Sequence, residues 1–303
     1  MVTDLRCSVW ARERQVDPIG TAGSYSGFLL VEWPLPWPRD VSEIPELEAL
    51  APAARKAGVR VQAVIPDQES SQPRVMLYTW DAGKGAYSGA EAPAGPDAAE
   101  TCLALLEGGS PTGTVAIQAT DVLVCGHGRR DRCCGSLGTS LEMAVASSGI
   151  LGPGVRVWRT SHTGGHRFAP TAVVLPEGTA WAYLDEETLR RVVAREGDFA
   201  DLAGHYRGCT GLPGPAAQAV EREALRQVGW NLLDQPRRAE NADEGVTRLV
   251  ASDPSGATRS WEGRVVTTRL LAVPRCGEVV TDQDKTEPEL AVEGLTGRVV
   301  TPV

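Results

Sequence analysis

Residues 114–150 read TVAIQATDVLVCGHGRRDRCCGSLGTSLEMAVASSGI, and this stretch decides the fold of the chain. Its first part alternates apolar with polar residues and is rich in β-branched residues, so it predicts a strand that ends at Cys125. From residue 135 onward the apolar residues recur at helical spacing, and we expect Thr139 or Ser140 to cap the start of that helix. The stretch therefore predicts a strand, a loop rich in ligand-type side chains, and a helix.

The segments that follow continue the same unit. Residues 155–162 predict a strand, and residues 171–184 predict two strands joined by a turn at Pro176, Glu177 and Gly178. Residues 185–197 predict a helix, with acidic residues in its first turn and glycine after its end. The order strand, helix, strand, strand, strand, helix is that of a thioredoxin-like sandwich. We therefore predict an α/β fold class, with one or more thioredoxin-like domains that have a mixed sheet and flanking helices.

The chain before this unit predicts a further α/β segment. Three apolar runs, at residues 27–33, 59–65 and 74–80, are typical of strands. A stretch with the spacing of a helix lies between the first two of these runs. The run WPLPWP, Trp33–Pro38, predicts a rigid surface loop because prolines fix φ and remove hydrogen-bond donors. Residues 82–98 are rich in glycine, alanine and proline, and they predict a mobile loop.

The chain after the unit predicts helices and then a small β-rich module. Residues 199–235 favour two helical pieces. A hairpin-rich module follows, because DPSG at 253–256 is a strong turn signal between strand-like runs, and we expect the polar tail after 281 to be loose. The predicted domains are residues 1–110, residues 111–235 and residues 236–303.

Composition excludes several classes of protein. The 303 residues are 42% hydrophobic and 23% charged, which excludes wholesale disorder, and the net charge of −9 argues against a general nucleic-acid binder. No apolar run approaches the roughly 18 residues of a membrane span, so we expect no membrane partner. The first 15 residues mix both charge signs without an apolar core, and the seven cysteines are few and odd in number. We therefore expect a cytoplasmic protein in a reducing compartment.

Two segments concentrate side chains that bind metals, CGHGRRDRCC at 125–134 and SHTGGH at 161–166. If the strands that end at Cys125 and just before His162 are parallel neighbours, both segments lie at one edge of the sheet. Gly164 and Gly165 would each weaken a helix by about 1 kcal/mol, so the spacing of His162 and His166 belongs to a loop rather than to a helical zinc motif.

Two thiolates and two imidazoles suit either zinc or an iron-sulfur cluster. Zinc fingers place paired cysteines about two to four residues apart. Cys125 and Cys134 are nine positions apart, which leaves a loop wide enough for a larger object. The spacing therefore favours a dinuclear cluster over a single ion.

These motifs resemble the sucrase/ferredoxin-like family, which belongs with the thioredoxin-like ferredoxins. The resemblance rests on CGH followed by RD before the second cysteine, and on SHTGGHRFAPTAVVLPEG at 161–178. It extends to GFLLVEWPLPW at 27–37 and RGCTGLPGPAAQAVEREALR at 207–226, and so covers residues from about 20 to about 235. Ordinary thioredoxin-like ferredoxins have a CxGxCxxAP pattern, and His162 and His166 stand where its two cysteines would.

The resemblance implies a 2Fe-2S cluster with Cys125 and Cys134 on one iron and His162 and His166 on the other. Cys133 is the alternative to Cys134, and the glycine that follows the ligand in the family pattern favours Cys134. Neutral imidazoles in place of thiolates raise the reduction potential and couple reduction to protonation of the free ring nitrogen. The potential is then expected to depend on pH.

The sequence supports one leading functional hypothesis and two alternatives. The first is an electron carrier or redox sensor that is not an enzyme in its own right and whose partner is a reductase or another redox protein. The second is a structural zinc module that uses the same four ligands to stabilise a protein-binding edge. The third is a thiol oxidoreductase that uses Cys133 with Cys134 or Cys125, which the absence of any CxxC motif disfavours.

Other polar residues near the motif have ordinary explanations as well as functional ones. His127 is either a donor to the ligands or a cap of the loop, and Cys133, if it is not a ligand, is a reactive thiol or buried filler. The charged run at 129–132 is either a solvated loop, a support for the ligands or a docking patch for an acidic partner. The remaining cysteines lie in unrelated segments and are predicted to be structural: Cys7, Cys102, Cys209 and Cys276.

Overall fold

The computed structural model describes residues 4–300 except residues 68, 69, 71, 96, 242–244, 254, 255, 282 and 283. A short N-terminal helix, α1 (Cys7–Glu13), precedes the first half of the large sheet. That half contains, in chain order, β1 (Gly27–Glu32), η1 (Val41–Glu43), α2 (Pro45–Glu48), α3 (Ala51–Lys56), β2 (Val59–Val64), β3 (Arg74–Asp81), β4 (Ala86–Pro93), α4 (Ala98–Leu106) and β5 (Val115–Ala116).

The second half begins with the predicted strand that ends at Cys125. Its elements are β6 (Thr120–Cys125), the π-helical turn η2 (Cys134–Gly138), α5 (Thr139–Ser148), β7 (Val155–Thr160), η3 (His166–Phe168), β8 (Ala172–Leu175), β9 (Thr179–Trp181), α6 (Glu186–Ala194), α7 (Phe199–Leu202), η4 (Ala203–His205), β10 (Tyr206–Cys209), α8 (Gly214–Val228) and η5 (Gly229–Asp234). The predicted order of strand, helix, three strands and helix is present in β6 to α6.

The ten strands β1 to β10 form one mixed sheet in the order β10-β9-β8-β6-β7-β2-β1-β3-β4-β5. Each half has the same plan: β1 is parallel to β2 and antiparallel to β3, just as β6 is parallel to β7 and antiparallel to β8. The halves meet where β2 and β7 run antiparallel, with Val64 opposite Thr160 at the carboxyl end of both strands. Loops that follow the parallel strands of both halves therefore meet near the centre of the molecule.

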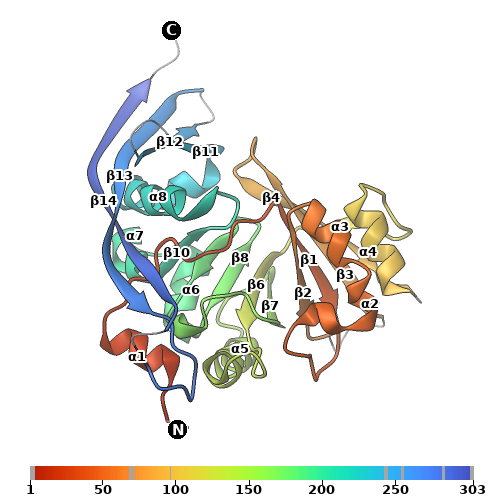
Figure 1. Ribbon diagram of the computed structural model, residues 1–303. Coiled ribbons are helices and arrows are strands. Elements are labelled where there is room, and N and C mark those ends of the chain that lie inside the picture. The colour runs from red at the N-terminus through yellow and green to blue at the C-terminus, as the bar shows by residue number, and fades with distance from the viewer. Residues whose placement is uncertain are drawn as a thin grey trace.

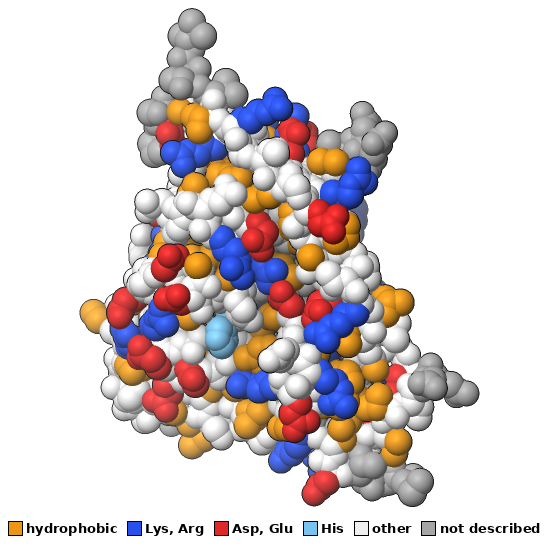
Figure 2. Space-filling view, turned by 90° about the vertical axis from the view of Figure 1, so that its left-hand side faces the viewer, with side chains coloured by type: hydrophobic (Ala, Val, Ile, Leu, Met, Phe, Trp, Pro, Cys, Tyr) orange, Lys and Arg blue, Asp and Glu red, His pale blue; other side chains and the backbone are white. Residues whose placement is uncertain are grey.

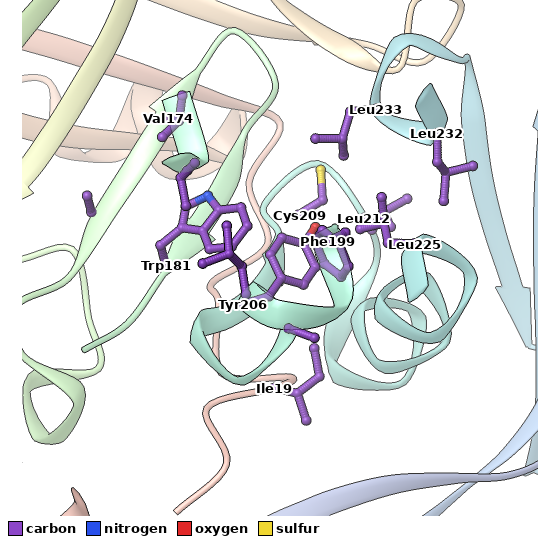
Figure 3. Packing of buried hydrophobic residues seen from close by; sticks show 14 of the residues in the cluster. Ile19, Val174, Trp181, Phe199, Tyr206, Cys209, Leu212, Leu225, Leu232 and Leu233 are labelled. Atoms are coloured by element: carbon purple, nitrogen blue, oxygen red, sulfur yellow. The ribbon is translucent and has the colours of Figure 1, made fainter. Parts of the chain in front are cut away.

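Apolar side chains cover both faces of this sheet. Alternation along β6 sends Leu123 to a core shared by the two halves, and Val122 and Val124 to the core under the helices of the second half. That second core centres on Trp181, whose ring lies 5.0 Å from the ring of Tyr206 (Figure 3). The mixed sheet with flanking helices confirms the predicted α/β class, while the predicted domain boundaries stay a prediction.

Four further strands form a separate antiparallel sheet that α8 covers: β11 (Arg237–Asn241), β12 (Val246–Ser252), β13 (Thr258–Ala272) and β14 (Thr286–Val300). This sheet confirms the predicted C-terminal module, and β13 and β14 run past α8 toward α1 (Figure 1). The expectation of a loose tail after 281 is wrong, because Leu290 and Val292 of β14 pack on the α8 core. Pro254 and Ser255 of the expected turn lie outside the described residues.

Three other local predictions are corrected. The expected mobile loop at 82–98 contains β4, which pairs with β3 along its whole length. The expected cap at Thr139 or Ser140 is wrong because the chain already turns helically from Cys134, so Thr139 is an interior residue of that coil. Residues 199–235 contain the strand β10 between their helical pieces. In the part of the chain that the structure describes, none of the helices is long and apolar enough to cross a membrane.

A buried ion pair joins the C-terminal module to the large sheet. The Nε of Arg237, on β11, donates to Glu221 Oε1 of α8 at 2.6 Å, and both side chains are fully buried. The other oxygen of Glu221 accepts from Tyr206 Oη at 2.7 Å and from the Cys209 amide at 3.1 Å, while Arg237 also donates to the Gly85 carbonyl at 3.0 Å. One carboxylate therefore ties together α8, β10 and β11.

We expect Glu221→Gln to lower the free energy of unfolding by about 3 to 5 kcal/mol, because it leaves the Arg237 guanidinium buried without a carboxylate. Glu223→Gln is the control, since Glu223 pairs with Arg222 and Arg226 in a partly exposed setting, and it should cost less than about 1 kcal/mol. Urea unfolding of both variants measures the difference. Equal losses would contradict the role given to the buried pair.

Candidate metal centre

The two ligand segments lie at one edge of the sheet, as the parallel arrangement of β6 and β7 requires. Cys125 is the last residue of β6 and lies opposite Thr160, the last residue of β7, so His162 begins just beyond the same edge. The sulfurs of Cys125 and Cys134 and a ring nitrogen of His162 all lie within 4.8 Å of one another. The distance from Cys125 Sγ to His162 Nδ1 is 3.8 Å. The structure thus brings three of the four predicted ligands together.

The segment between β6 and the π-helical turn η2, residues 126–133, is called the ligand loop below. Cys134 lies near Cys125 because η2 begins at Cys134 and brings the chain back to the end of β6. Gly138 closes that turn against the Cys125 carbonyl, where any side chain would collide with the oxygen. Both cysteine side chains are fully buried. The nine positions from Cys125 to Cys134 therefore allow the chain to loop around a buried site.

His166, the fourth predicted ligand, lies at the border of this group. Its ring centroid is 6.3 Å from that of His162. Its Nδ1 is 3.5 Å from Asp131 Oδ2 and 3.5 Å from Cys7 Sγ. His166 is thus close to His162 but also faces residues outside the predicted set.

The loop that carries the two histidines is held by both halves of the molecule. Arg60 and Gln62 of β2 donate to the His162 carbonyl at 2.7 and 3.2 Å. Gly164 and Gly165 have φ of +89° and +71°, which agrees with the expectation of a loop rather than a helix. First-half residues therefore position a histidine of the second half.

Arg207 is a buried cation next to this loop. It donates to the Gly164 carbonyl at 3.2 Å and to the Thr21 carbonyl at 2.6 Å. Burial lowers the pKa of Arg207 to about 10, while the charges of Cys125 and Cys134 act in the opposite direction. The guanidinium therefore stabilises negative charge on the two sulfurs.

The pKa values of the two sulfurs of the group are shifted in opposite directions. The pKa of Cys125 is held well below its ordinary value because Cys134 and then His162 donate hydrogen bonds to it. The hydrogen bond to Cys125, together with burial, raises the pKa of Cys134. Burial lowers the pKa of His166 although Asp131 opposes this shift, which favours the neutral imidazole that binds metals. The shifts therefore favour a thiolate at Cys125 and a neutral imidazole at His166.

His127 contacts the proline-rich loop of the first half. Its Nε2 lies 2.9 Å from the Pro38 carbonyl, and its ring packs edge-on against Trp37 at 5.7 Å. Burial lowers the pKa of His127. The loop Trp33–Pro38 is irregular as predicted, and through His127 it supports the ligand loop that follows β6.

A second group of ligand-type side chains lies beside the first: Cys7, Asp131, Cys133 and Cys276, whose ligand atoms all lie within 4.8 Å of one another. Cys7 and Cys276, which were expected in unrelated segments, therefore lie in contact with each other, and their structural role stays a prediction. They are 269 positions apart, one in α1 and one between β13 and β14, so no local signal could have paired them. Cys102 and Cys209 lie in apolar cores, as expected.

The fold and the sites define a mixed α/β protein with buried cysteine-containing groups that could hold metal ions. A model of the sucrase/ferredoxin-like family matches residues 18–208, which is more than half of the chain, so the chain belongs to that family. The match confirms the resemblance drawn from the ligand motifs. Searches of curated proteins and of solved structures found no match.

Gly165→Ala tests how tightly the histidine loop is held. A Cβ at Gly165 would lie 2.5 Å from Arg207 Nη2 at a φ of +71°, so we expect a loss of more than about 2 kcal/mol of unfolding free energy. Gly149 has a similar φ of +61° with nothing within 4 Å, and Gly149→Ala should cost about 1 kcal/mol. Urea unfolding compares them, and equal costs would show that contact with Arg207 does not matter.

Proposed function

We propose that this chain is a 2Fe-2S protein for electron transfer or redox sensing, with Cys125 and Cys134 on one iron and His162 and His166 on the other. The observation that carries the proposal is the meeting of two buried cysteines and a histidine at one sheet edge, in a family named for ferredoxins. Soft thiolates and imidazoles are the ligands that such clusters use.

The place of His166 favours two metal ions over one. A single tetrahedral ion needs all four ligand atoms within one coordination shell. Cys125, Cys134 and His162 meet that condition, but His166 is not in their group, and its ring lies 6.3 Å from that of His162. A zinc module with these four ligands therefore fits less well than a diiron cluster, which supplies a second metal for the second pair.

The chain's own residues would set the properties of the site. When bound, a 2Fe-2S cluster takes up and returns one electron, at a higher potential with imidazole ligands than with four thiolates. Burial of Cys125 and Cys134 excludes water, and the Arg207 guanidinium offsets the negative charge that an added electron brings. Cys125 and Cys134 would bind iron as thiolates, so binding would release any proton that they carry.

His162 also lines a cleft of about 490 Å³ that opens beside the site. Four arginines lie on the walls of the cleft: Arg39, Arg55, Arg60 and Arg130. In a chain of net charge −9 this concentration of positive charge supports docking of an acidic redox partner, such as a reductase. An imidazole ligand at a docking cleft gives the electron a short path to that partner.

Other partners find less support. Figure 2 shows Lys and Arg side chains beside Asp and Glu side chains across the face that carries β13 and β14, rather than a basic stripe. Ion pairs such as Arg269 with Glu289 at 2.6 Å belong to this sheet. This face therefore offers no support for a nucleic-acid or membrane partner, and the net charge of −9 also argues against a nucleic-acid partner. We propose a reducing, cytoplasmic compartment because the seven cysteines are few and odd in number.

Iron and sulfide analysis, visible absorption and EPR test the proposal on the full chain. After reconstitution we expect about two irons and two labile sulfides per chain, with an EPR signal on reduction. Cys134→Ser should abolish the signal, whereas Cys133→Ser should keep it. A colourless protein would refute the cluster, and one zinc without sulfide at these four ligands would select the zinc module. Loss of all redox activity in Cys133→Ser with iron retained would favour a thiol oxidoreductase.

His166→Cys tests the histidine ligand directly. A thiolate is anionic and carries no titrating ring nitrogen, so we expect the variant to keep a cluster whose potential is lower by on the order of 100 mV. The wild-type potential should fall as the pH rises, because reduction takes up a proton, and the variant should show a weaker slope. Protein-film voltammetry at several pH values measures both. An unchanged potential would exclude His166 as a ligand.

A further inference from the structure

The group of Cys7, Asp131, Cys133 and Cys276 has the dimensions of a metal site. The sulfur of Cys276 lies 3.2 Å from that of Cys133 and 3.5 Å from that of Cys7. One carboxylate oxygen, Asp131 Oδ1, lies 3.4 Å from Cys7 Sγ and 3.3 Å from Cys276 Sγ. The four ligand atoms thus lie close enough together to share one ion, all within 4.8 Å of one another.

These separations can be compared with those of a tetrahedral zinc site. Bond lengths of about 2.3 Å to sulfur and about 2.0 to 2.2 Å to oxygen give tetrahedron edges of about 3.8 Å between sulfurs and about 3.5 Å between sulfur and oxygen. The observed edges of 3.2 to 3.5 Å fall slightly inside these values. A small outward movement of the side chains would admit the ion.

We propose that Cys7, Asp131, Cys133 and Cys276 form a second metal site, which binds one structural Zn²⁺. Four protein ligands leave no open coordination position, so the ion would stabilise the fold rather than act on a substrate. Three thiolates select a soft or borderline metal over Mg²⁺ or Ca²⁺. The site uses none of the four residues proposed to hold the iron-sulfur cluster.

Backbone amides around the group donate hydrogen bonds to the Cys276 sulfur and the Asp131 carboxylate and so hold these side chains in position. The Cys7 amide donates to Cys276 Sγ at 3.5 Å, and the Cys133 amide donates to Asp131 Oδ1 at 2.8 Å. The Cys276 amide donates to Asp131 Oδ2 at 3.3 Å. Hydrogen bonds of this kind, to a sulfur or a carboxylate that binds a metal directly, fix the orientation of that ligand. The group is therefore held in position by more than packing of its side chains.

The arrangement fits a metal better than a disulfide. A disulfide between Cys133 and Cys276 would use two of the sulfurs and leave Cys7 and the Asp131 carboxylate beside them without a role. Cys7, Cys133 and Asp131 are buried, whereas Cys276 is partly exposed and gives an ion a way in from solvent. The Asp131 carboxylate, held by the Cys133 and Cys276 amides, faces the sulfurs of Cys7 and Cys276 and so completes a set of four ligands.

A zinc ion here would fasten three segments that are remote in the sequence. Cys7 begins α1, Asp131 and Cys133 belong to the ligand loop after β6, and Cys276 lies between β13 and β14. The Gly277 amide donates to the Leu5 carbonyl at 2.9 Å, so the outer segments already touch. Because Asp131 Oδ2 lies 3.5 Å from His166 Nδ1, the ion would also steady the border of the other site.

Metal analysis of the full chain, purified without chelators, tests the proposal. We expect about one zinc per chain in the wild type and less than about a tenth in Cys276→Ser and in Cys7→Ser, with the iron content of both variants retained. Cys125→Ser should show the reverse, with zinc kept and iron lost. Cys102→Ala, which removes a buried cysteine from an apolar core, is the control and should keep both metals.

Cobalt provides a readout that does not depend on iron. The Cys125→Ser variant loaded with Co²⁺ should show the d–d bands and sulfur charge-transfer bands of tetrahedral thiolate coordination, and the added change Cys276→Ser should remove them. Absence of zinc and of these bands in folded protein would overturn the proposal. So would a Cys133–Cys276 disulfide found by mass spectrometry in the native chain, or Co²⁺ bands that persist without Cys276.

Discussion

The antiparallel contact between β2 and β7 joins the two halves of the large sheet and determines where the loops that carry the candidate ligands lie. These strands touch only at their carboxyl ends, Val64 against Thr160, so the loops that follow them are forced into one region. Arg60 and Gln62 then reach the His162 carbonyl from the other half, and the Trp33–Pro38 loop reaches His127. The ligand loops are consequently supported on two sides, although both belong to the second half of the sheet.

Two charged side chains, Arg207 and Asp131, contact the loop that carries His162 and His166. Arg207, buried next to the histidine loop, donates to the backbone carbonyls of Gly164 and Thr21, and burial lowers its pKa to about 10. Asp131 lies between the two ligand groups and contacts His166 on one side and Cys276 on the other. The site is therefore one electrostatic unit in which a change at either group alters the field at the other.

Most of the fold could be predicted from the sequence because its signals are local. The alternation along residues 120–125 and the Gly164–Gly165 pair are read within a few residues, and the structure bears them out. The pairing of Cys7 with Cys276 could not be predicted, since it depends on how β13 and β14 travel past α8 to α1. The start of α5 was misjudged because a π-helical turn supplies the hydrogen bonds that a capping side chain would otherwise supply.

The part of the chain that matches the family ends at residue 208 and begins at residue 18. Cys125, Cys134, His162 and His166 all lie inside it. The second group is divided, because Asp131 and Cys133 lie inside the matched range, whereas Cys7 lies before it and Cys276 after it. A chain limited to that range would contain all four residues of the first group but only two of the second. The family match therefore covers the whole of the first group and only half of the second.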